Sequence, residues 1–257
     1  MCLILFAYKV HPRYRLVLGA NRDEFYARPT APLDFWQDHP EILAGRDLEQ
    51  QGTWMGTTRS GRLAAVTNFR DPADLRSDAQ SRGRLVTDFL TGRMPPGEYL
   101  RGIKEEADRY NGFNLIVGDA SGLFYFSKHA KEIRPLGPGI YGLSNHLLDT
   151  PWPKVAYGKK QLGHLLRGSE EISTEALLKL LEHQIGVPDA DLPATGVGIE
   201  WERILSPIFI TSPDYGTRSS SVLTIDIEGR IRFTERTWKH DQAVPREHFT
   251  RSFELTD

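Results

Sequence analysis

The pattern of hydrophobic and polar positions divides the chain into blocks of strands and blocks of helices. Runs rich in β-branched and aromatic residues predict strands at 3–10, 13–18, 52–57, 62–69, 113–117, 123–126, 140–143, 208–211, 219–226 and 231–238. Apolar positions recur at helical spacing between Arg82 and Tyr110, in two helices separated by Gly92 and Pro95-Pro96, and at 155–166 and 174–184. Segregated blocks of this kind favour an α+β fold with largely antiparallel sheets.

The segments between these elements predict turns, a surface excursion and a tail. Residues 19–24 are interpreted as a turn that is followed by an irregular, proline-rich stretch. Residues 186–198 are expected to form a surface excursion. The sequence contains no internal repeat and no low-complexity linker, so residues 1–257 are predicted to form a single domain with a charged, mobile tail over about 240–257. Hairpin turns are predicted at Ser60-Gly61 and Glu228-Gly229.

Composition and charge narrow the class of protein. The formal net charge of -2, with basic residues scattered along the chain, argues against nucleic acid as a partner. No apolar run approaches the ~20 residues that a membrane-spanning helix needs, and the N-terminus lacks the features of a secretion signal, so we expect a soluble, cytoplasmic protein. The single cysteine forms no internal disulfide and no multi-thiolate metal site, and no metal site is predicted.

That cysteine, Cys2, follows the initiator methionine directly. Removal of Met1 would leave one residue that carries both a thiol and a free α-amine. The amine, with an ordinary pKa near ~8, can accept the thiol proton, so no second residue is needed as a base. The alternative is that Cys2 is a small buried strand residue, which is how most lone cysteines behave.

A second candidate feature is the run Asn-Arg-Asp-Glu at 21–24, where two acids, a cation and an amide lie close together after a strand. In a functional interpretation these four side chains belong to a site. In the structural alternative, Asn21 and Asp23 cap a turn through their own backbone, while Arg22 and Glu24 are solvated.

Six short blocks follow one another along the chain: Met1-Cys2, Asn21-Arg22-Asp23-Glu24, Gly52-Thr53-Trp54-Met55-Gly56, Thr67-Asn68-Phe69, Gly142-Leu143-Ser144-Asn145 and Tyr215-Gly216-Thr217-Arg218. Together they resemble the NRDE family, also called the transport-and-Golgi-organisation family. This family is similar to cysteine-type N-terminal-nucleophile hydrolases such as bile-salt hydrolases and penicillin V acylases. The resemblance implies a four-layer αββα sandwich, the N-terminal-nucleophile hydrolase fold, which agrees with the segregated blocks described above.

The resemblance also implies roles for five residues. Cys2 matches the nucleophile, and Asp23 matches an acid that holds the free amine of that nucleophile. Asn68 matches an asparagine at a strand end that helps to form the oxyanion site, and Asn145 matches a second asparagine that lines the pocket. Arg218 matches a late arginine whose charge favours the thiolate.

The chain departs from the acylases at one position. They carry an arginine three residues before the aspartate, where this sequence has Ala20. Arg22 could supply the missing charge from a neighbouring position, or strand alternation could point it away from the thiol. This departure bears on hydrolase activity and not on the fold, because the same fold can keep a binding pocket after catalysis is lost.

Two functions therefore remain open for a pocket centred on Cys2. The first is amide or acyl hydrolysis through a Cys2 acyl-enzyme, which requires no cofactor and predicts a thiol of low pKa. The second is non-catalytic binding and trafficking of haem, or of acyl-CoA and lipid metabolites; haem would then be a transported, non-covalent ligand because no Cys-x-x-Cys-His pattern is present. A scaffold for membrane traffic has no supporting motif. The sequence does not fix the oligomeric state.

The predicted substrate-binding residues for this small-molecule pocket each have an ordinary structural alternative. Trp54 could line an apolar pocket or be part of the core, which is the commoner use of tryptophan. His146 adjoins Asn145 and could touch the ligand or be a polar loop residue. The full set is Asn21, Arg22, Glu24, Trp54 and His146.

Overall fold

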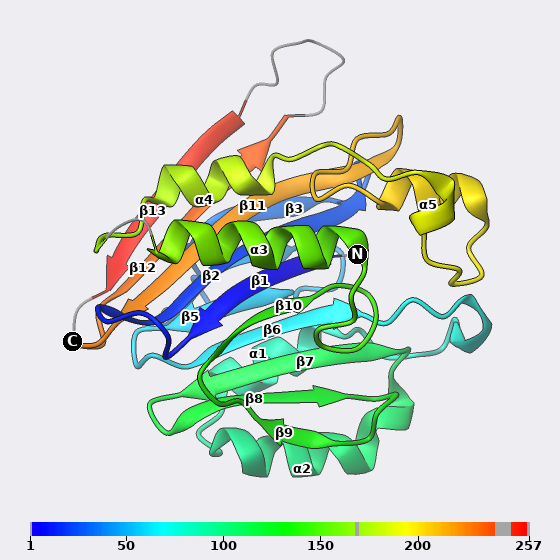
Figure 1. The fold of residues 1–257 in the computed structure, drawn as a ribbon. Coiled ribbons are helices and arrows are strands. Elements are labelled where there is room, and N and C mark those ends of the chain that lie inside the picture. The colour runs from blue at the N-terminus through cyan, green and yellow to red at the C-terminus, as the bar shows by residue number, and fades with distance from the viewer. Residues whose placement is uncertain (1, 168–169, 240–247, 256–257) are drawn as a thin grey trace. The chain divides into compact units, whose positions relative to one another are not determined.

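The computed structural model describes residues 2–167, 170–239 and 248–255 (Figure 1). Contacts within the chain divide it into two compact units. Unit 1 comprises Met1–Ala27, Pro138–Ser144 and Leu148–Leu255, and unit 2 comprises Arg28–Gly137 and Asn145–Leu147. Both units are built from segments that are separated in sequence, and the single domain over residues 1–257 stays a prediction.

Unit 1 contains a six-stranded sheet with the strand order β10-β1-β2-β11-β12-β13, and all its neighbouring strands pair antiparallel. The N-terminal strands β1 and β2 are therefore interior strands. The strands are β1 (Cys2–Tyr8), β2 (Tyr14–Phe25), β10 (Gly139–Leu143), β11 (Tyr215–Asp226), β12 (Ile231–Trp238) and β13 (His248–Leu255). The helices are α3 (Pro153–Arg167), α4 (Thr174–Leu181), η3 (Asp189–Asp191) and α5 (Ile199–Leu205).

One face of the unit 1 sheet packs against α3 and α4 (Figure 1). Alternation along β1 sends Leu3, Leu5 and Ala7 to this face, where they join a buried apolar cluster. Val155 of α3 and Leu178 of α4 belong to the same cluster. Cys2, Ile4 and Phe6 alternate with them and point to the opposite face of the sheet.

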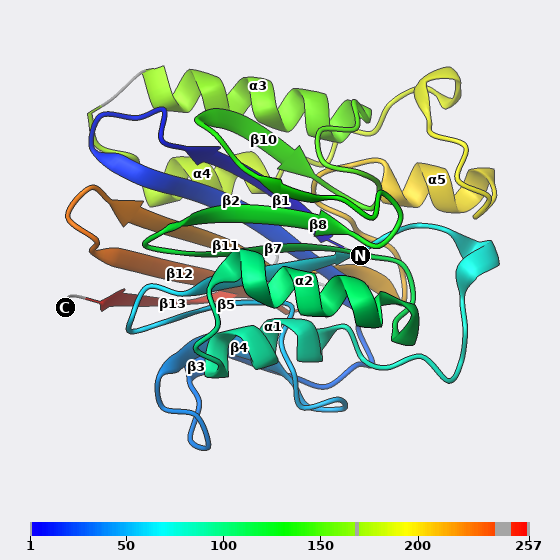
Figure 2. The ribbon, with the colours of Figure 1, turned by 90° about the horizontal axis from the view of Figure 1, so that it is seen from below.

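Unit 2 contains a seven-stranded antiparallel sheet whose strands follow chain order, β3-β4-β5-β6-β7-β8-β9. Its helices α1 and α2 pack against one face of that sheet (Figure 2). At this face, residues such as Phe89 and Leu100 meet Val66 and Leu115. The strands are β3 (Thr30–Phe35), β4 (Ile42–Asp47), β5 (Met55–Thr58), β6 (Leu63–Asn68), β7 (Phe113–Asp119), β8 (Gly122–Ser127) and β9 (Ile133–Pro135). The helical segments are η1 (Pro72–Asp74), α1 (Gly83–Thr91), α2 (Pro96–Glu106) and η2 (Ala107–Arg109).

The predicted turn at 19–24 is wrong. These residues lie inside β2. Residues 19–22 pair with β1 on one side, and 19–24 pair with β11 on the other, so the polar run belongs to an interior strand of the sheet. The predicted strand at 208–211 is also wrong, because only an isolated bridge joins Thr211 to Gly216. The proline-rich segment is not irregular throughout: it contains β3, an edge strand that accommodates Pro32 beside a register shift.

The C-terminal region differs from the predicted tail. Residues 248–255 form β13, which pairs with β12 over eight residues, whereas 240–247 and 256–257 lie outside the described residues. Both predicted hairpin turns are confirmed, with Gly61 at φ 77° and Gly229 at φ 92°. None of the helices in the part of the chain that the structure describes is long and apolar enough to cross a membrane.

Candidate functional site

Cys2 is the first residue of β1, where it is buried. Its carbonyl oxygen accepts a hydrogen bond from Ser144 Oγ at 3.4 Å, and its sulfur accepts one from the backbone N–H of Asp23. Burial raises the pKa of the Cys2 thiol to about 11; the Asp23 charge also raises this pKa, while the Arg22 charge lowers it. In the chain that begins with Met1, the pKa shift is thus opposite to the one that the hydrolase hypothesis predicts.

The sheet register places the neighbours of Cys2 on two different faces. Cys2 pairs with Arg22 of β2, so both side chains lie on the face that turns away from α3 and α4. Ala20 is two residues before Arg22 and shares that face. Arg22 therefore supplies a positive charge on the side of the thiol, on the same face as the position where the acylases carry arginine. Asn21 and Asp23 lie on the helix-covered face.

Asp23 is buried and held by a hydroxyl group. Its Oδ1 accepts a hydrogen bond from Thr217 Oγ1 at 2.7 Å, and that hydroxyl in turn accepts the backbone N–H of Ile210 at 2.9 Å. Burial raises the pKa of Asp23, whereas the positive charge of Lys154 and the hydrogen bond from Thr217 lower it. Asp23 is thus fixed in position, and its charge depends on a nearby cation.

Asn21 connects the sheet to its helical layer. Its Nδ2 donates to the carbonyl oxygens of Leu181 and Ile208, both at 2.9 Å, and its Oδ1 accepts from Ser220 Oγ at 2.7 Å. Both amide hydrogens and the amide oxygen of this completely buried side chain therefore have protein partners. Contact with a substrate stays a prediction for Asn21.

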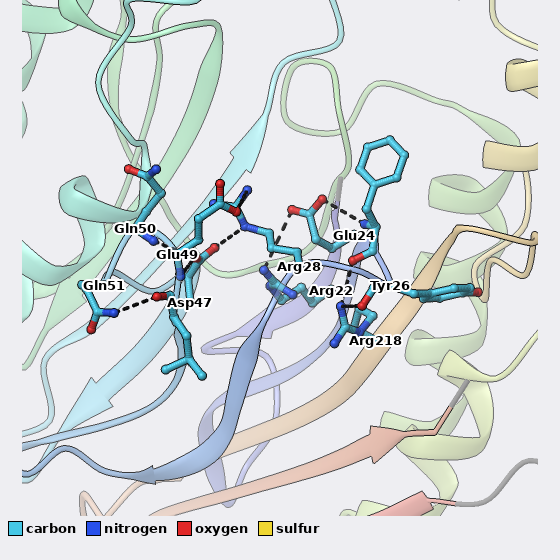
Figure 3. A network of polar contacts seen from close by, with 11 residues as sticks. Arg22, Glu24, Tyr26, Arg28, Asp47, Glu49, Gln50, Gln51 and Arg218 are labelled. Carbon is cyan, nitrogen blue, oxygen red and sulfur yellow. Dashed lines mark hydrogen bonds and ion pairs between the residues drawn. The ribbon is translucent and has the colours of Figure 1, made fainter. Parts of the chain in front are cut away.

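Arg218 and Glu24 lie at the ends of β11 and β2 in unit 1 (Figure 3). Arg218 occupies a register shift between Thr217 and Ser219, and its Nη1 donates to the carbonyl oxygens of Phe25 at 2.8 Å and Tyr26 at 3.1 Å. Burial lowers the pKa of Arg218, and the charge of Arg22 lowers it further. Glu24 accepts the backbone N–H of Phe25 at 2.9 Å and lies 3.9 Å from Arg22 Nη2.

Within unit 2 the structure brings the two predicted asparagines together. Asn68 ends β6, and Asn145 Nδ2 donates to its carbonyl oxygen at 3.0 Å. The carbonyl oxygen of Asn145 accepts the backbone N–H of Arg70 at 2.7 Å. These bonds join the end of β6 to the 145–147 segment, which is distant in sequence. The oxyanion role of both asparagines stays a prediction.

The other two predicted residues of unit 2 have different surroundings. The His146 ring lies 4.8 Å from the ring of Phe69, which stacks on His129 at 3.7 Å. Burial lowers the pKa of His146, and the nearby His129 lowers it further, so both favour the neutral form of the ring. Trp54 packs, partly buried, against the apolar core of its unit, as its structural alternative expects.

Two residues near Asp23 had no predicted role. Thr217 belongs to one of the six blocks, but only its neighbour Arg218 was assigned a function. Lys154 is 6% exposed, and it begins a stripe that continues with the buried residues Gly158 and Leu162 of α3. A lysine at an apolar position of a helical pattern is a sequence signal that could have identified it.

The described residues contain no group of three or more His, Cys, Asp or Glu side chains that could hold a metal ion. In unit 2, a cavity of about 620 Å³ lies beside the end of α1, and Arg62 and Asp119 are among its lining residues. Asn68, Asn145, Trp54 and His146 do not line it. This cavity is therefore separate from the predicted site residues of that unit.

Comparisons with known proteins agree with the motif blocks. The profile of the family described as Transport and Golgi organisation 2 matches residues 1–240. The chain belongs to this family. A Transport and Golgi organization protein 2 homolog from Bos taurus is 38% identical over 275 residues, covering 99% of both chains. The human homolog is 36% identical, covering 100% of this chain and 99% of its own length.

This Transport and Golgi organisation 2 family member also resembles a solved hydrolase. The C2A mutant of the conjugated bile acid hydrolase from Clostridium perfringens matches with a TM-score of 0.54 and 8% sequence identity, covering 99% of this chain and 92% of that chain. At this identity the likeness concerns the fold alone. Together with the two antiparallel sheets, it confirms the predicted N-terminal-nucleophile hydrolase fold.

Proposed function

We propose that this family member hydrolyses an amide or acyl bond through Cys2, after removal of Met1. The observation that supports this proposal most directly is the arrangement at the start of β1: a single cysteine whose sulfur accepts the backbone N–H of a buried carboxylate residue, Asp23. Arg22, on the same face as Cys2, favours the thiolate by its charge. A structural cysteine needs neither neighbour.

In the proposed mechanism, the α-amine of Cys2 accepts the thiol proton, and the thiolate attacks the substrate carbonyl carbon. The tetrahedral intermediate collapses to a thioester, and the ammonium gives its proton to the leaving group. Water then hydrolyses the thioester, which releases the acid and restores the thiol. Asp23 holds the amine in place, and Thr217 holds Asp23. Retained Met1 would prevent this reaction because the amine would belong to another residue.

Intact-protein mass spectrometry tests the proposal. We expect loss of Met1, and we expect an acyl adduct on Cys2 when the processed protein is mixed with an N-acyl amide or an acyl thioester. Cys2→Ala should abolish both adduct and turnover, while Cys2→Ser keeps the shape of the site and tests the weaker nucleophile. Quantitative retention of Met1, or equal turnover by Cys2→Ala, would contradict the mechanism.

A second candidate is binding without turnover of haem, or of acyl-CoA and lipid metabolites. The observation that favours it is the buried, protonated thiol, whose pKa of about 11 makes it a poor nucleophile at pH 7. Titration of the processed protein, whose first residue is Cys2, with haem and with an acyl-CoA distinguishes the two candidates. A carrier binds one of them and returns it unchanged; consumption of the acyl thioester supports the hydrolase.

A further inference from the structure

Lys154 occupies an unusual place for a cation. It is the second residue of α3, in the first turn of the helix, and is 6% exposed. A positive charge is disfavoured at a helix N-terminus because the backbone N–H groups there carry partial positive charge. It is also disfavoured in a buried position unless a carboxylate compensates it. A lysine that is both buried and at a helix N-terminus therefore needs a negative charge nearby.

The contacts of Lys154 lead to Asp23 through packed residues of unit 1. Lys154 Nζ donates to the carbonyl oxygen of Leu205 at 2.9 Å, at the end of α5. Leu205 packs against Ile210 in a buried cluster, and the backbone N–H of Ile210 donates to Thr217 Oγ1 at 2.9 Å. Thr217 Oγ1 then donates to Asp23. The ammonium and the carboxylate are thus joined through one short, buried series of contacts.

The position of Asp23 on the sheet and the electrostatic effect of Lys154 both support a charge pair between these two residues. Asp23 lies on the face of the unit 1 sheet that α3 and α4 cover, and Lys154 belongs to α3. After burial, which raises the pKa of Asp23, the charge of Lys154 is the largest influence on that pKa, and it lowers it. Arg22 has the corresponding position on the opposite face, beside Cys2.

We propose that Lys154 is a positioning residue whose ammonium is the counter-charge of Asp23 and keeps this carboxylate negative, ready to hold the α-amine of Cys2. The inference rests on the proposed function for its purpose, but the charge pairing itself does not need turnover. It assigns the two cations different tasks: Arg22 acts on the thiol from one face, and Lys154 acts on the acid from the other. The alternative is that Lys154 only caps the end of α5 through Leu205.

Titration of Asp23 separates these two roles. In protein labelled with ¹³C at the aspartate carboxyl carbon, the Asp23 signal is assigned by its absence in Asp23→Asn. We expect Lys154→Gln to raise the pKa of Asp23 by about one unit or more, which is about tenfold in proton affinity. Lys154→Arg should restore the pKa. Lys160→Gln removes a charge from an exposed position of the same helix and should leave it unchanged. An unchanged pKa in Lys154→Gln would overturn the proposal in favour of capping alone.

A reciprocal measurement covers the case in which Lys154→Gln does not fold. A pairwise charge interaction lowers the pKa of the acid and raises the pKa of the base by the same amount. Asp23→Asn should therefore lower the pKa of Lys154, which is measured from the NMR signal of a ¹³C label at Lys154 Cε. An unchanged Lys154 pKa in folded Asp23→Asn would overturn the proposal. Both titrations use the unprocessed chain without substrate. A failure of hydrolysis with intact titration shifts would therefore refute only the proposed function.

Discussion

Replacement of Thr217 by valine tests how much the hydroxyl that binds Asp23 stabilises the protein. Thr217 Oγ1 makes two buried hydrogen bonds, donating to Asp23 Oδ1 at 2.7 Å and accepting from Ile210 N at 2.9 Å. Valine keeps the shape of threonine but makes neither bond. Loss of a hydrogen bond to a charged group costs about 1.5–3 kcal/mol, and the buried N–H left without an acceptor costs about 1–3 kcal/mol. Together these predict that Thr217→Val lowers the free energy of unfolding by about 2.5–6 kcal/mol.

Thr217→Ser is the matched control. Serine retains the hydroxyl and both hydrogen bonds and loses one methyl group, for a cost of about 1 kcal/mol. Urea denaturation of the three proteins at pH 7 gives the comparison, with equal m-values required for each pair. If the free energy of unfolding of Thr217→Val is within about 1 kcal/mol of the wild-type value, or equals that of Thr217→Ser, the two hydrogen bonds of the Thr217 hydroxyl do not stabilise the protein.

Three further predictions follow from burial and packing. Iodoacetamide should label Cys2 of the unprocessed folded chain slowly at pH 7, and the labelling rate should increase towards pH 11, because burial raises the pKa of the Cys2 thiol to about 11. Fast labelling at pH 7 would disprove this prediction. The pKa of Asp23 is raised by burial, so the folded state binds the Asp23 proton more tightly than the unfolded state, and the contribution of Asp23 to stability falls as pH rises above about 4. Urea titrations should show that Asp23→Asn gains stability relative to wild type across that window, and a constant difference would be inconsistent with the raised pKa. An added Cβ at Gly158 would lie 2.5 Å from Leu5 Cδ1, so Gly158→Ala should lower the free energy of unfolding by about 1–3 kcal/mol. An added Cβ at Gly102 would meet open space, so Gly102→Ala should raise the free energy of unfolding by up to about 1 kcal/mol. Equal midpoints in urea for these two helical variants would contradict the packing.

The sequence predicted best those elements whose pattern is local. The stretch 155–166 became α3, because its apolar positions repeat at helical spacing and Pro153 suits a first helical turn. Gly61 and Gly229 marked their hairpin turns because only a glycine adopts positive φ at low cost. These signals are read within a few residues and need no knowledge of distant partners.

The failures depend on partners that are far away in sequence. The polar run at 21–24 resembles a turn, but it lies in an interior strand because β1 and β11 satisfy its backbone, and because buried partners take up side chains such as Asn21. Strand β13 was missed because its exposed edge face contains polar residues and only β12 gives it order. Among the candidate residues, the motif blocks named Asp23. Lys154 left only a local signal, a lysine at an apolar helical position, and its relation to Asp23 depends on the packing of α3 on the sheet.

The central position of β1 and β2 affects the order in which the protein can fold during synthesis. Arg218 and the carbonyl of Phe25 that it binds are 193 positions apart, and the strand β11 that contains Arg218 completes one side of β2. At a translation rate of about 5–20 residues per second, roughly 10 to 40 s pass between synthesis of these two partners. During this interval β2 lacks the β11 partner that completes one of its sides. Removal of Met1, which the proposed mechanism requires, would then act on an N-terminal hairpin whose sheet is still incomplete.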